Sequence, residues 1–228
     1  MTAKTERTED GAILYDDALL DHARPGLLEP PAEAAAAVGG RGAAWMLKHG
    51  EDEWVLRHYR RGGVPGRFVR DRYLWVGLDH SRPWWEWRLL DALYREGLPV
   101  PQPVAARVQR SGLLYRGDLI TRRIPAARNL AERLASGGDV SWPAVGRCLR
   151  RFHDAGVCHA DLNAHNILLD DSGGIHLIDF DRGTRRGAGP WKQVNLSRLK
   201  RSLDKLSGAG GFNLKAWGAL LEGYGRVD

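Results

Sequence analysis

The chain has 228 residues, 43% of them hydrophobic, which is enough for one compact domain or two tightly joined lobes. Its net charge of +6 favours anionic partners, namely phosphates, nucleic acid or an anionic membrane surface, without choosing among them. Two cysteines are too few for a disulfide framework, no apolar run reaches about 18 residues, and the polar residues 1–10 lack the apolar core of a signal peptide. We therefore expect a cytoplasmic protein with a disordered N-terminus at residues 1–10.

The first half of the chain is typical of strands with a single helix. The predicted strands are 43–48, 53–59, 105–110 and 113–122, with turns at residues 49–52 and at Ser111-Gly112. The start signal Ser81-Arg82-Pro83 predicts a helix that runs to about Glu96 and ends at Gly97. We assign residues 11–124 to a β-rich N-lobe.

The second half is mainly helical. A helix is predicted at residues 143–155, and the apolar runs 167–169 and 175–178 flank a hairpin turn. Apolar residues at helical spacing predict two more helices, carrying Leu196, Leu199, Leu203 and Leu206 in one and Leu214, Trp217, Leu220 and Leu221 in the other. We assign residues 125–228 to a helical C-lobe, so the expected fold is α+β with a cleft between the lobes.

The strongest motif is a polar loop, His159-Ala160-Asp161-Leu162-Asn163-Ala164-His165-Asn166, which lies between a helix and a hairpin. It matches the kinase catalytic-loop pattern H-x-D-x-x-x-x-N. Phosphoryl transfer needs a carboxylate that accepts the proton of the acceptor hydroxyl, and we predict Asp161 as this base. It also needs neutral oxygen ligands for Mg²⁺, a role for which Asn166 is suited. The alternative is a polar loop with turn-forming Asn and Asp.

A second acidic motif, Leu177-Ile178-Asp179-Phe180-Asp181, follows one hairpin later. It is similar to the D-F-G magnesium loop, with Asp181 where glycine usually stands. The hairpin is expected to bring Asp161 and Asp179 to the same cleft edge, so we predict Asp179 as a metal ligand. A turn-capping acid at a strand end is the alternative. For Asp181 a second magnesium and an arginine partner both stay open.

The helix that begins at Ser81 carries Glu86 on an apolar face, together with three leucines, Leu89, Leu90 and Leu93. A buried carboxylate is costly unless a cation meets it. In kinases such a glutamate pairs with a strand lysine that holds the ATP phosphates. Here the strand offers Arg57, whose fork suits both carboxylate and phosphate, and we favour it over Lys48 on the preceding strand. A solvent-exposed glutamate is the alternative.

Glycines at residues 39, 40 and 42 precede the first predicted strand. Gly40 and Gly42 are therefore candidates for a loop that covers the ATP phosphates, although a third spaced glycine is missing because Trp45 stands there. Glycine-rich turns are common, so a flexible linker is the alternative.

These motifs resemble the lipopolysaccharide kinase group of the protein-kinase-like superfamily, and within it the kinases of 3-deoxy-D-manno-octulosonic acid (Kdo). The likeness spans roughly residues 10 to 225. The segments that carry it are Val55-Leu56-Arg57-His58-Tyr59-Arg60-Arg61-Gly62-Gly63, Arg82-Pro83 with Glu86, Gly97-Leu98-Pro99-Val100-Pro101, His159-Ala160-Asp161-Leu162-Asn163, Ile178-Asp179-Phe180-Asp181-Arg182-Gly183 and Asn195-Leu196-Ser197-Arg198-Leu199.

The resemblance implies a protein-kinase-like bilobal fold and transfer of the ATP γ-phosphate to the 4-hydroxyl of Kdo on a lipid A precursor. It also implies peripheral attachment to the cytoplasmic side of the inner membrane. Asp161 maps onto the catalytic aspartate, and Asn166 and Asp179 map onto the metal ligands. Arg57 departs from the general kinase pattern, which has a lysine on this strand.

The residues themselves agree with such a substrate. Arginines of residues 57–72 suit the Kdo carboxylate and lipid phosphates, and their mixture with aromatic residues suits a membrane interface. A basic surface with the tryptophans in the core is the alternative. No A-P-E segment follows the metal loop, which argues against a protein substrate, and we infer no protein partner.

Three rival functions stay open. The first is another small-molecule kinase that acts on heptose or an aminoglycoside. The second is a catalytically inactive nucleotide-binding scaffold, motivated by the missing strand lysine, although such a scaffold needs none of Asp161, Asn166 and Asp179. The third is a nucleic-acid-binding module, which rests on charge alone because no nucleic-acid motif is present, so we expect no nucleic-acid partner.

Overall fold

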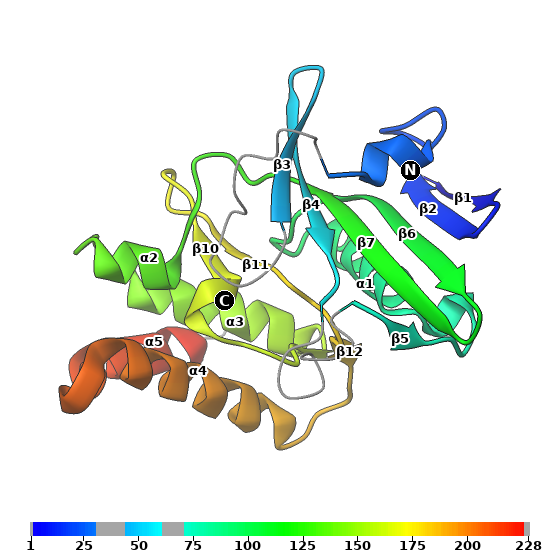
Figure 1. Ribbon diagram of the computed structural model, residues 1–228. Coiled ribbons are helices and arrows are strands. Elements are labelled where there is room, and N and C mark those ends of the chain that lie inside the picture. Colours follow the sequence, from blue (N-terminus) through cyan, green and yellow to red (C-terminus); the bar gives the residue numbers. More distant parts are fainter. Residues whose placement is uncertain (1, 31–43, 61–70, 226–228) are drawn as a thin grey trace. The chain divides into compact units, whose positions relative to one another are not determined.

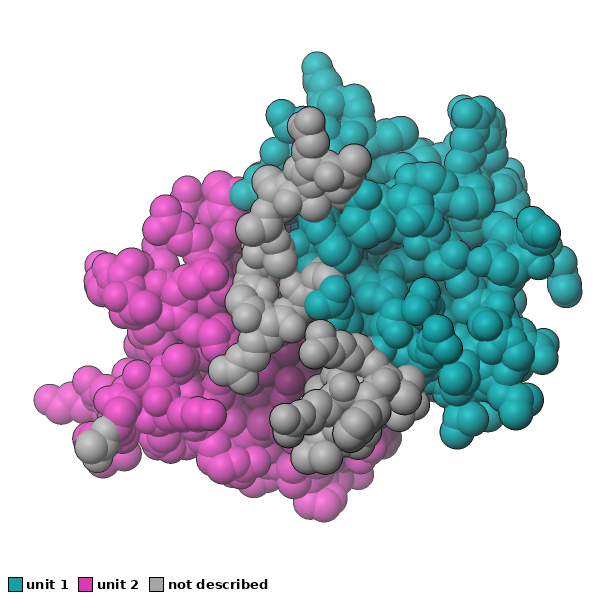
Figure 2. All heavy atoms as spheres, viewed as in Figure 1, with its two compact units in different colours: residues 1–92, 101–123 teal, residues 93–100, 124–228 magenta. Residues whose placement is uncertain are grey.

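The structure is a computed structural model that describes residues 2–30, 44–60 and 71–225 (Figure 1). The chain forms two compact units, residues 1–92 with 101–123 and residues 93–100 with 124–228 (Figure 2). The sequence pattern assigns residues 93–100 to the N-lobe, whereas here they belong to the second unit, where the Leu177 amide donates to the Pro99 carbonyl at 3.0 Å.

The first unit is built on a seven-stranded antiparallel sheet. Its strands are β1 (Ala3–Thr8), β2 (Gly11–Asp16), β3 (Ala44–His49), β4 (Asp52–His58), β5 (Tyr73–Leu74), β6 (Pro103–Ser111) and β7 (Leu114–Arg122). They follow the order β1-β2-β6-β7-β4-β3, and β5 pairs with the beginning of β7. The helical elements of this part are η1 (Pro25–Leu28), η3 (Leu78–His80) and α1 (Arg82–Arg95), whose last turn belongs to the second unit.

Two glycines explain why the predicted hairpins form. Gly50, between β3 and β4, has φ +61°, and Gly112, between β6 and β7, has the same value. L-residues with a Cβ rarely adopt this left-handed conformation, whereas glycine adopts it freely. Space is not the constraint, because a Cβ at either position meets nothing within 4 Å. Both predicted hairpins are confirmed.

The N-terminus differs from the expected disordered segment. Residues 3–8 form the edge strand β1, paired with β2 from Ala3 opposite Asp16 to Thr8 opposite Gly11. The Tyr15 hydroxyl adds a 2.7 Å bond to Glu6 Oε1. The expectation was wrong because polar composition reports only that side chains face water, and the backbone of an edge strand pairs regardless of such side chains.

One core cluster of the first unit lies on one face of the sheet, beneath the segment that contains η1. Trp54 and Leu56 of β4 point into it, since alternate residues of a strand share a face. The members of this cluster are Ile13, Tyr15, Leu20, Ala23, Leu28, Trp54, Leu56, Val104, Ala105 and Ile120. Arg57 directly follows Leu56 in β4. Its side chain therefore faces the opposite side of the sheet.

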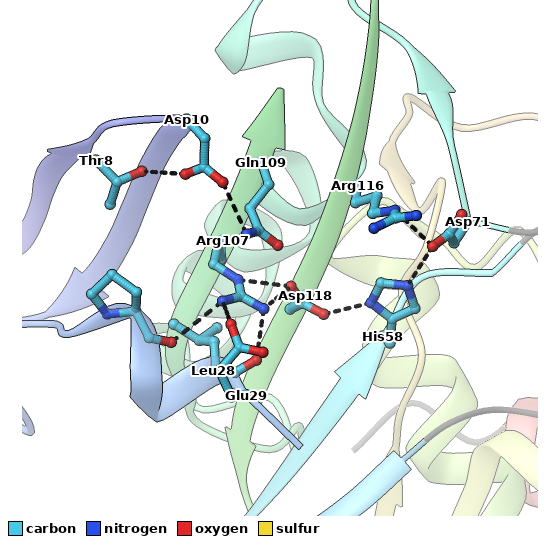
Figure 3. Close-up of polar contacts among 11 residues, drawn as sticks. Thr8, Asp10, Leu28, Glu29, His58, Asp71, Arg107, Gln109, Arg116 and Asp118 are labelled. Carbon is cyan, nitrogen blue, oxygen red and sulfur yellow. Dashed lines mark hydrogen bonds and ion pairs between the residues drawn. The ribbon is translucent and has the colours of Figure 1, made fainter. Parts of the chain in front are cut away.

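A row of polar side chains crosses the same sheet (Figure 3). Arg107 of β6, Asp118 of β7 and His58 of β4 stand directly opposite one another in the strand register. Arg107 Nε donates to Asp118 at 2.9 Å, and Asp118 Oδ1 lies 2.6 Å from His58 Nδ1. Arg107 also pairs with Glu29 and donates to the Leu28 carbonyl at 2.8 Å. Each nearly buried charge thus meets its opposite, and Arg107 ties the η1 segment to the sheet.

The second unit is mainly helical. Its helices are α2 (Leu130–Ala135), α3 (Trp142–Asp154), α4 (Trp191–Ser207) and α5 (Leu214–Gly225), with the short turns η4 (Ala164–Asn166) and η5 (Gly208–Gly210). Short strands connect them: β8 (Arg128–Asn129), β10 (Ile167–Leu169) and β11 (Ile175–Leu177) form one sheet, and β9 (Val157–Cys158) pairs with β12 (Thr184–Arg185).

Helices α3 and α5 pack through a pair of glycines. A Cβ on Gly146 would lie 2.0 Å from the Leu220 carbonyl oxygen, and one on Gly223 would lie 2.1 Å from the Pro143 carbonyl oxygen. The backbones therefore touch directly. The predicted apolar stripe of α5 is only partly realised, since Leu220 is buried while Leu214 is 78% exposed. The glycine contact selects the face of residues 220 and 223 for burial.

The expected fold class, α+β with a β-rich first part and a helical second part, is confirmed by the two units. Among the described residues, no helix combines the length and hydropathy needed to cross a membrane.

Candidate active site

His159 opens the predicted catalytic loop and is 2% exposed. Its Nδ1 accepts a 3.1 Å hydrogen bond from the backbone amide of Asp161, so the ring proton resides on Nε2. Nε2 then donates to the carbonyl of Ile178 at 2.9 Å. One imidazole thus joins the catalytic loop to the strand end that precedes Asp179.

Burial disfavours the protonated form of the same histidine. Burial lowers the pKa of His159 below its ordinary value, against smaller opposing effects of the Ile178 carbonyl, Asp179 and Asp161. The ring of Phe180 packs against it with centroids 4.8 Å apart. The doubly hydrogen-bonded imidazole braces the loop.

Asp161 is held by its backbone, whereas its carboxylate is presented to solvent. The side chain is 58% exposed. Oδ1 accepts from Arg198 Nη1 at 2.6 Å, and Oδ2 accepts from Asn163 Nδ2 at 3.2 Å. A carboxylate in this setting can accept a proton from an incoming hydroxyl without first breaking a buried contact.

The two predicted metal ligands, Asn166 and Asp179, come from segments that are bonded together. Asn166 Nδ2 donates to the Asp161 carbonyl at 2.9 Å, and the Asn166 carbonyl accepts from the Ile178 amide at 3.1 Å. With its amide nitrogen engaged, Asn166 has Oδ1 left as an acceptor. An amide oxygen and a carboxylate match the oxygen ligands that Mg²⁺ prefers, so these residues fit the ion.

The turn that begins at Asp179 is fixed by its backbone and by Phe180. Asp179 has φ +63°, in the left-handed region that Asp tolerates better than most residues. Phe180 is fully buried against Phe152, with ring centroids 5.9 Å apart, and its carbonyl accepts from the Gly183 amide at 2.7 Å. Asp181 is partly buried in this turn.

Helix α4 supports the catalytic loop from one side. The buried Asn195 accepts from the His159 amide through Oδ1 at 3.1 Å and donates to the His159 carbonyl through Nδ2 at 3.0 Å. Ser202 Oγ accepts from the Ala164 amide at 3.2 Å. Sequence reasoning assigned no role to Asn195, Arg198 or Ser202. One pattern in the sequence could have indicated them. They recur about once per helical turn, each next to a leucine that is buried in the structure.

In the first unit, Glu86 is 1% exposed and pairs with Arg57. The Tyr59 hydroxyl donates to the same carboxylate oxygen at 2.5 Å, and the Arg57 guanidinium lies 4.7 Å from the centre of the Tyr59 ring. The predicted ion pair between Glu86 and a strand cation is thus confirmed with Arg57. Lys48 lies near the exposed end of β3, opposite Glu53 in the strand register.

Some of the predicted binding residues lie outside the described residues, namely Gly40, Gly42 and the arginines of residues 61–70. The tryptophans 84, 85 and 87, which the sequence suggested for a membrane interface, differ in burial. Trp84 and Trp87 are buried in the core, while Trp85 is 47% exposed. The tryptophans of α1 therefore follow the core alternative for the most part.

The sequence also places the chain among known proteins. The family model described as "Lipopolysaccharide kinase (Kdo/WaaP) family" matches residues 29–224. The chain belongs to this family. A protein of Stenotrophomonas maltophilia (strain K279a) named 3-deoxy-D-manno-octulosonic acid kinase is 48% identical over 204 residues, 87% of this chain and 82% of that protein. One of the same name from Vibrio cholerae serotype O1 is 40% identical over 200 residues, 85% of each chain.

Among solved structures, the bifunctional kinase-methyltransferase WbdD aligns with a TM-score of 0.44 and 15% identity, over 77% of this chain and 40% of that one. Membership of the lipopolysaccharide kinase family makes this chain a phosphotransferase with a nucleotide as phosphate donor. The resemblance inferred from the motifs is thereby confirmed.

Proposed function

We propose that this chain transfers the γ-phosphate of ATP to the 4-hydroxyl of Kdo on a lipid A precursor, a step of lipopolysaccharide core biosynthesis. The observation that carries the proposal is the exposed carboxylate of Asp161, on a loop that contains Asn166 and is hydrogen-bonded to Ile178, the residue before Asp179. Relatives named as Kdo kinases, 40–48% identical over most of their length, support the choice of acceptor.

Five residues of the second unit have proposed parts in this reaction. Asp161 orients the acceptor hydroxyl and accepts its proton as the oxygen bonds to the γ-phosphorus and the bond to the bridging oxygen of ADP breaks. Asn166 and Asp179 hold Mg²⁺, which neutralises charge on the donor phosphates when bound. His159 and Asn195 keep the loop in place through its backbone.

In the first unit, Arg57 is the proposed contact to the ATP phosphates. It remains 25% exposed although it pairs with Glu86, and a guanidinium has enough N–H donors to serve a carboxylate and a phosphate together. Glu86 and Tyr59 orient it. Gly40 and Gly42 are the proposed backbone cover of the phosphates.

We also propose that the protein works at the cytoplasmic face of the inner membrane, with the β6–β7 turn as its point of contact. Leu113 in this turn is 77% exposed, and Leu74 and Val76 beside it are 66% and 67% exposed. The Trp75 amide donates to the Leu113 carbonyl at 2.9 Å, and Arg110 lies over the Trp75 ring at 5.4 Å. Exposed apolar residues beside an arginine and a tryptophan suit an anionic lipid surface.

The function is tested by ADP release with three acceptors: a Kdo-bearing lipid A precursor, a heptose-bearing lipid and an aminoglycoside. We expect release with the first acceptor alone, and mass spectrometry should place the new phosphate on the 4-hydroxyl. Asp161→Asn serves as the inactive control. Preferred turnover of heptose would replace Kdo with the rival acceptor, and no release with any of the three would favour an inactive scaffold.

The membrane contact is tested by sedimentation with vesicles that contain anionic phospholipid. Leu74→Ser combined with Leu113→Ser should weaken binding by about tenfold or more, because each buried leucine side chain contributes roughly 1.5–3 kcal/mol. The matched control is Leu214→Ser, since Leu214 of α5 is 78% exposed but lies in the other unit. Equal binding by the double variant and the control would contradict this contact surface.

A further inference from the structure

Arg198 stands against the proposed base without being needed to hold it. Its Nη1 lies 2.6 Å from Asp161 Oδ1, and the two side chains are 46% and 58% exposed. Ion pairs this exposed contribute little to stability. The loop is already held through its backbone by Asn195, Ser202 and Asn166. Arg198 is therefore the one side chain of α4 that reaches the loop at a functional carboxylate and not at the backbone.

Much of the binding capacity of Arg198 remains unused. A guanidinium carries five N–H donors in a planar fork, and the contact with Asp161 uses one of them. Within residues 2–30, 44–60 and 71–225, no second carboxylate pairs with Arg198. Planar forks of this kind bind carboxylates through two parallel hydrogen bonds. The site thus has room for an anion directly beside the base.

We propose that Arg198 binds the carboxylate of the acceptor sugar acid and so presents the acceptor hydroxyl to Asp161. This rests on the proposed function, because the acceptor must be an acid. In Kdo the carboxylate, carbon 1, is attached to ring carbon 2, and the reactive hydroxyl stands on carbon 4 of that ring. The hydroxyl donates to Asp161 and the carboxylate accepts from Arg198, each over a hydrogen bond of about 2.8 Å.

The pairing also explains how an acidic acceptor approaches an acidic base. Asp161 repels a second carboxylate, and the repulsion grows as water leaves the site. Arg198 sits against Asp161 and offers its remaining donors to the incoming acid, so one cation serves both anions. A neutral sugar offers Arg198 only hydroxyl acceptors, which bind a guanidinium less strongly than a carboxylate does. The residue therefore determines specificity for sugar acids over neutral sugars.

The test combines a variant with a modified acceptor. Arg198→Gln and the parent enzyme are each assayed with the Kdo-bearing acceptor and with the same acceptor after its carboxylate has been reduced to an alcohol. In the parent enzyme, reduction should lower kcat/KM by about 10- to 100-fold, the range expected for hydrogen bonds to a charged group. Arg198→Gln should lower kcat/KM for the acid by a similar factor and hardly distinguish the two acceptors.

Two controls separate binding from a structural role. Arg201→Gln, at an exposed position one turn further along α4, should discriminate between the acceptors as the parent does. The KM for ATP should be unchanged in Arg198→Gln. Equal discrimination by Arg198→Gln and the parent, or a loss confined to the KM for ATP, would overturn the assignment. A parent enzyme that does not phosphorylate the Kdo acceptor at all would instead overturn the proposed function, and the assignment with it.

Discussion

The two units each contain an arginine paired with a carboxylate, and the two pairs differ in burial. Glu86 is 1% exposed and its partner Arg57 is 25% exposed, whereas Asp161 is 58% exposed and Arg198 is 46% exposed. A buried carboxylate that loses its cation is left as an uncompensated charge, while an exposed one is solvated by water. The first pair is thus part of the fold, and the second pair can exchange partners during a reaction.

The largest effect that distinguishes the two ion pairs is expected from a substitution of Asp161. Asp161→Asn should lower turnover by about 10³-fold, because the proton acceptor is lost, and should leave the free energy of unfolding nearly unchanged. ADP release and urea unfolding measure the two quantities. The control is Asp171→Asn, another exposed aspartate of the second unit, which should retain full activity. A large loss of stability in Asp161→Asn would show that the exposed pair belongs to the fold after all.

Arg57 should behave in the opposite way. Arg57→Ala should lower the free energy of unfolding by about 3–5 kcal/mol, because it leaves the Glu86 carboxylate buried without its cation. Lys48→Ala, on the neighbouring strand, should change it by less than about 0.5 kcal/mol. Urea unfolding of both variants checks this. If the two variants lost equal stability, the ion pair of Glu86 would not depend on Arg57.

The buried His153 of the second unit should make the free energy of unfolding depend on pH. Burial lowers the pKa of His153 from 6.5 to about 4, and its Nδ1 lies 2.7 Å from the Tyr224 hydroxyl. Because the folded pKa is the lower one, the unfolded chain binds the extra proton as the pH falls. Stability from His153 is therefore complete above about pH 6.5 and falls by about 3 kcal/mol as the pH approaches 4.

Unfolding in urea at a series of pH values between 7 and 4 measures this loss. His153→Gln should flatten the profile, whereas the exposed His165→Gln should follow the parent. An unchanged slope in His153→Gln would assign the acid sensitivity to other groups, of which the buried His159 is the first to examine.

The smallest effect is expected at Arg198. Arg198→Gln should change the free energy of unfolding by less than about 1 kcal/mol, as is usual for exposed ion pairs. Thermal unfolding next to Arg57→Ala measures the contrast between the two arginines. A comparable loss in both would remove the distinction between a fold pair and an exchangeable pair.

Much of this fold could be predicted from sequence, because its signals are local. The turn glycines Gly50 and Gly112, the helix start before Arg82 and the apolar spacing of α1 depend only on neighbouring residues. The proposed catalytic and metal loops stand out in the sequence because their chemistry restricts residue types at short spacing. The partner of Glu86 was predicted because a buried acid requires a cation.

Other features depend on partners that are distant in sequence. Strand β1 forms through backbone pairing with β2, and its polar side chains give no sign of it. Asn195 looks like an ordinary polar helix residue until His159 is brought against it. The buried face of α5 is chosen by Gly146 on another helix, so leucine spacing alone selected residues such as Leu214 that remain exposed.

The glycine contact between α3 and α5 makes activity sensitive to substitutions outside the proposed active site. Any side chain at Gly146 or Gly223 would push the two helices apart, since a Cβ there falls within about 2 Å of a carbonyl oxygen. Helix α3 carries Phe152, which packs on Phe180, and Phe180 packs on the ring that braces the catalytic loop. Substitutions at these two glycines should therefore make activity heat-sensitive, because they disturb the packing that supports the proposed catalytic loop.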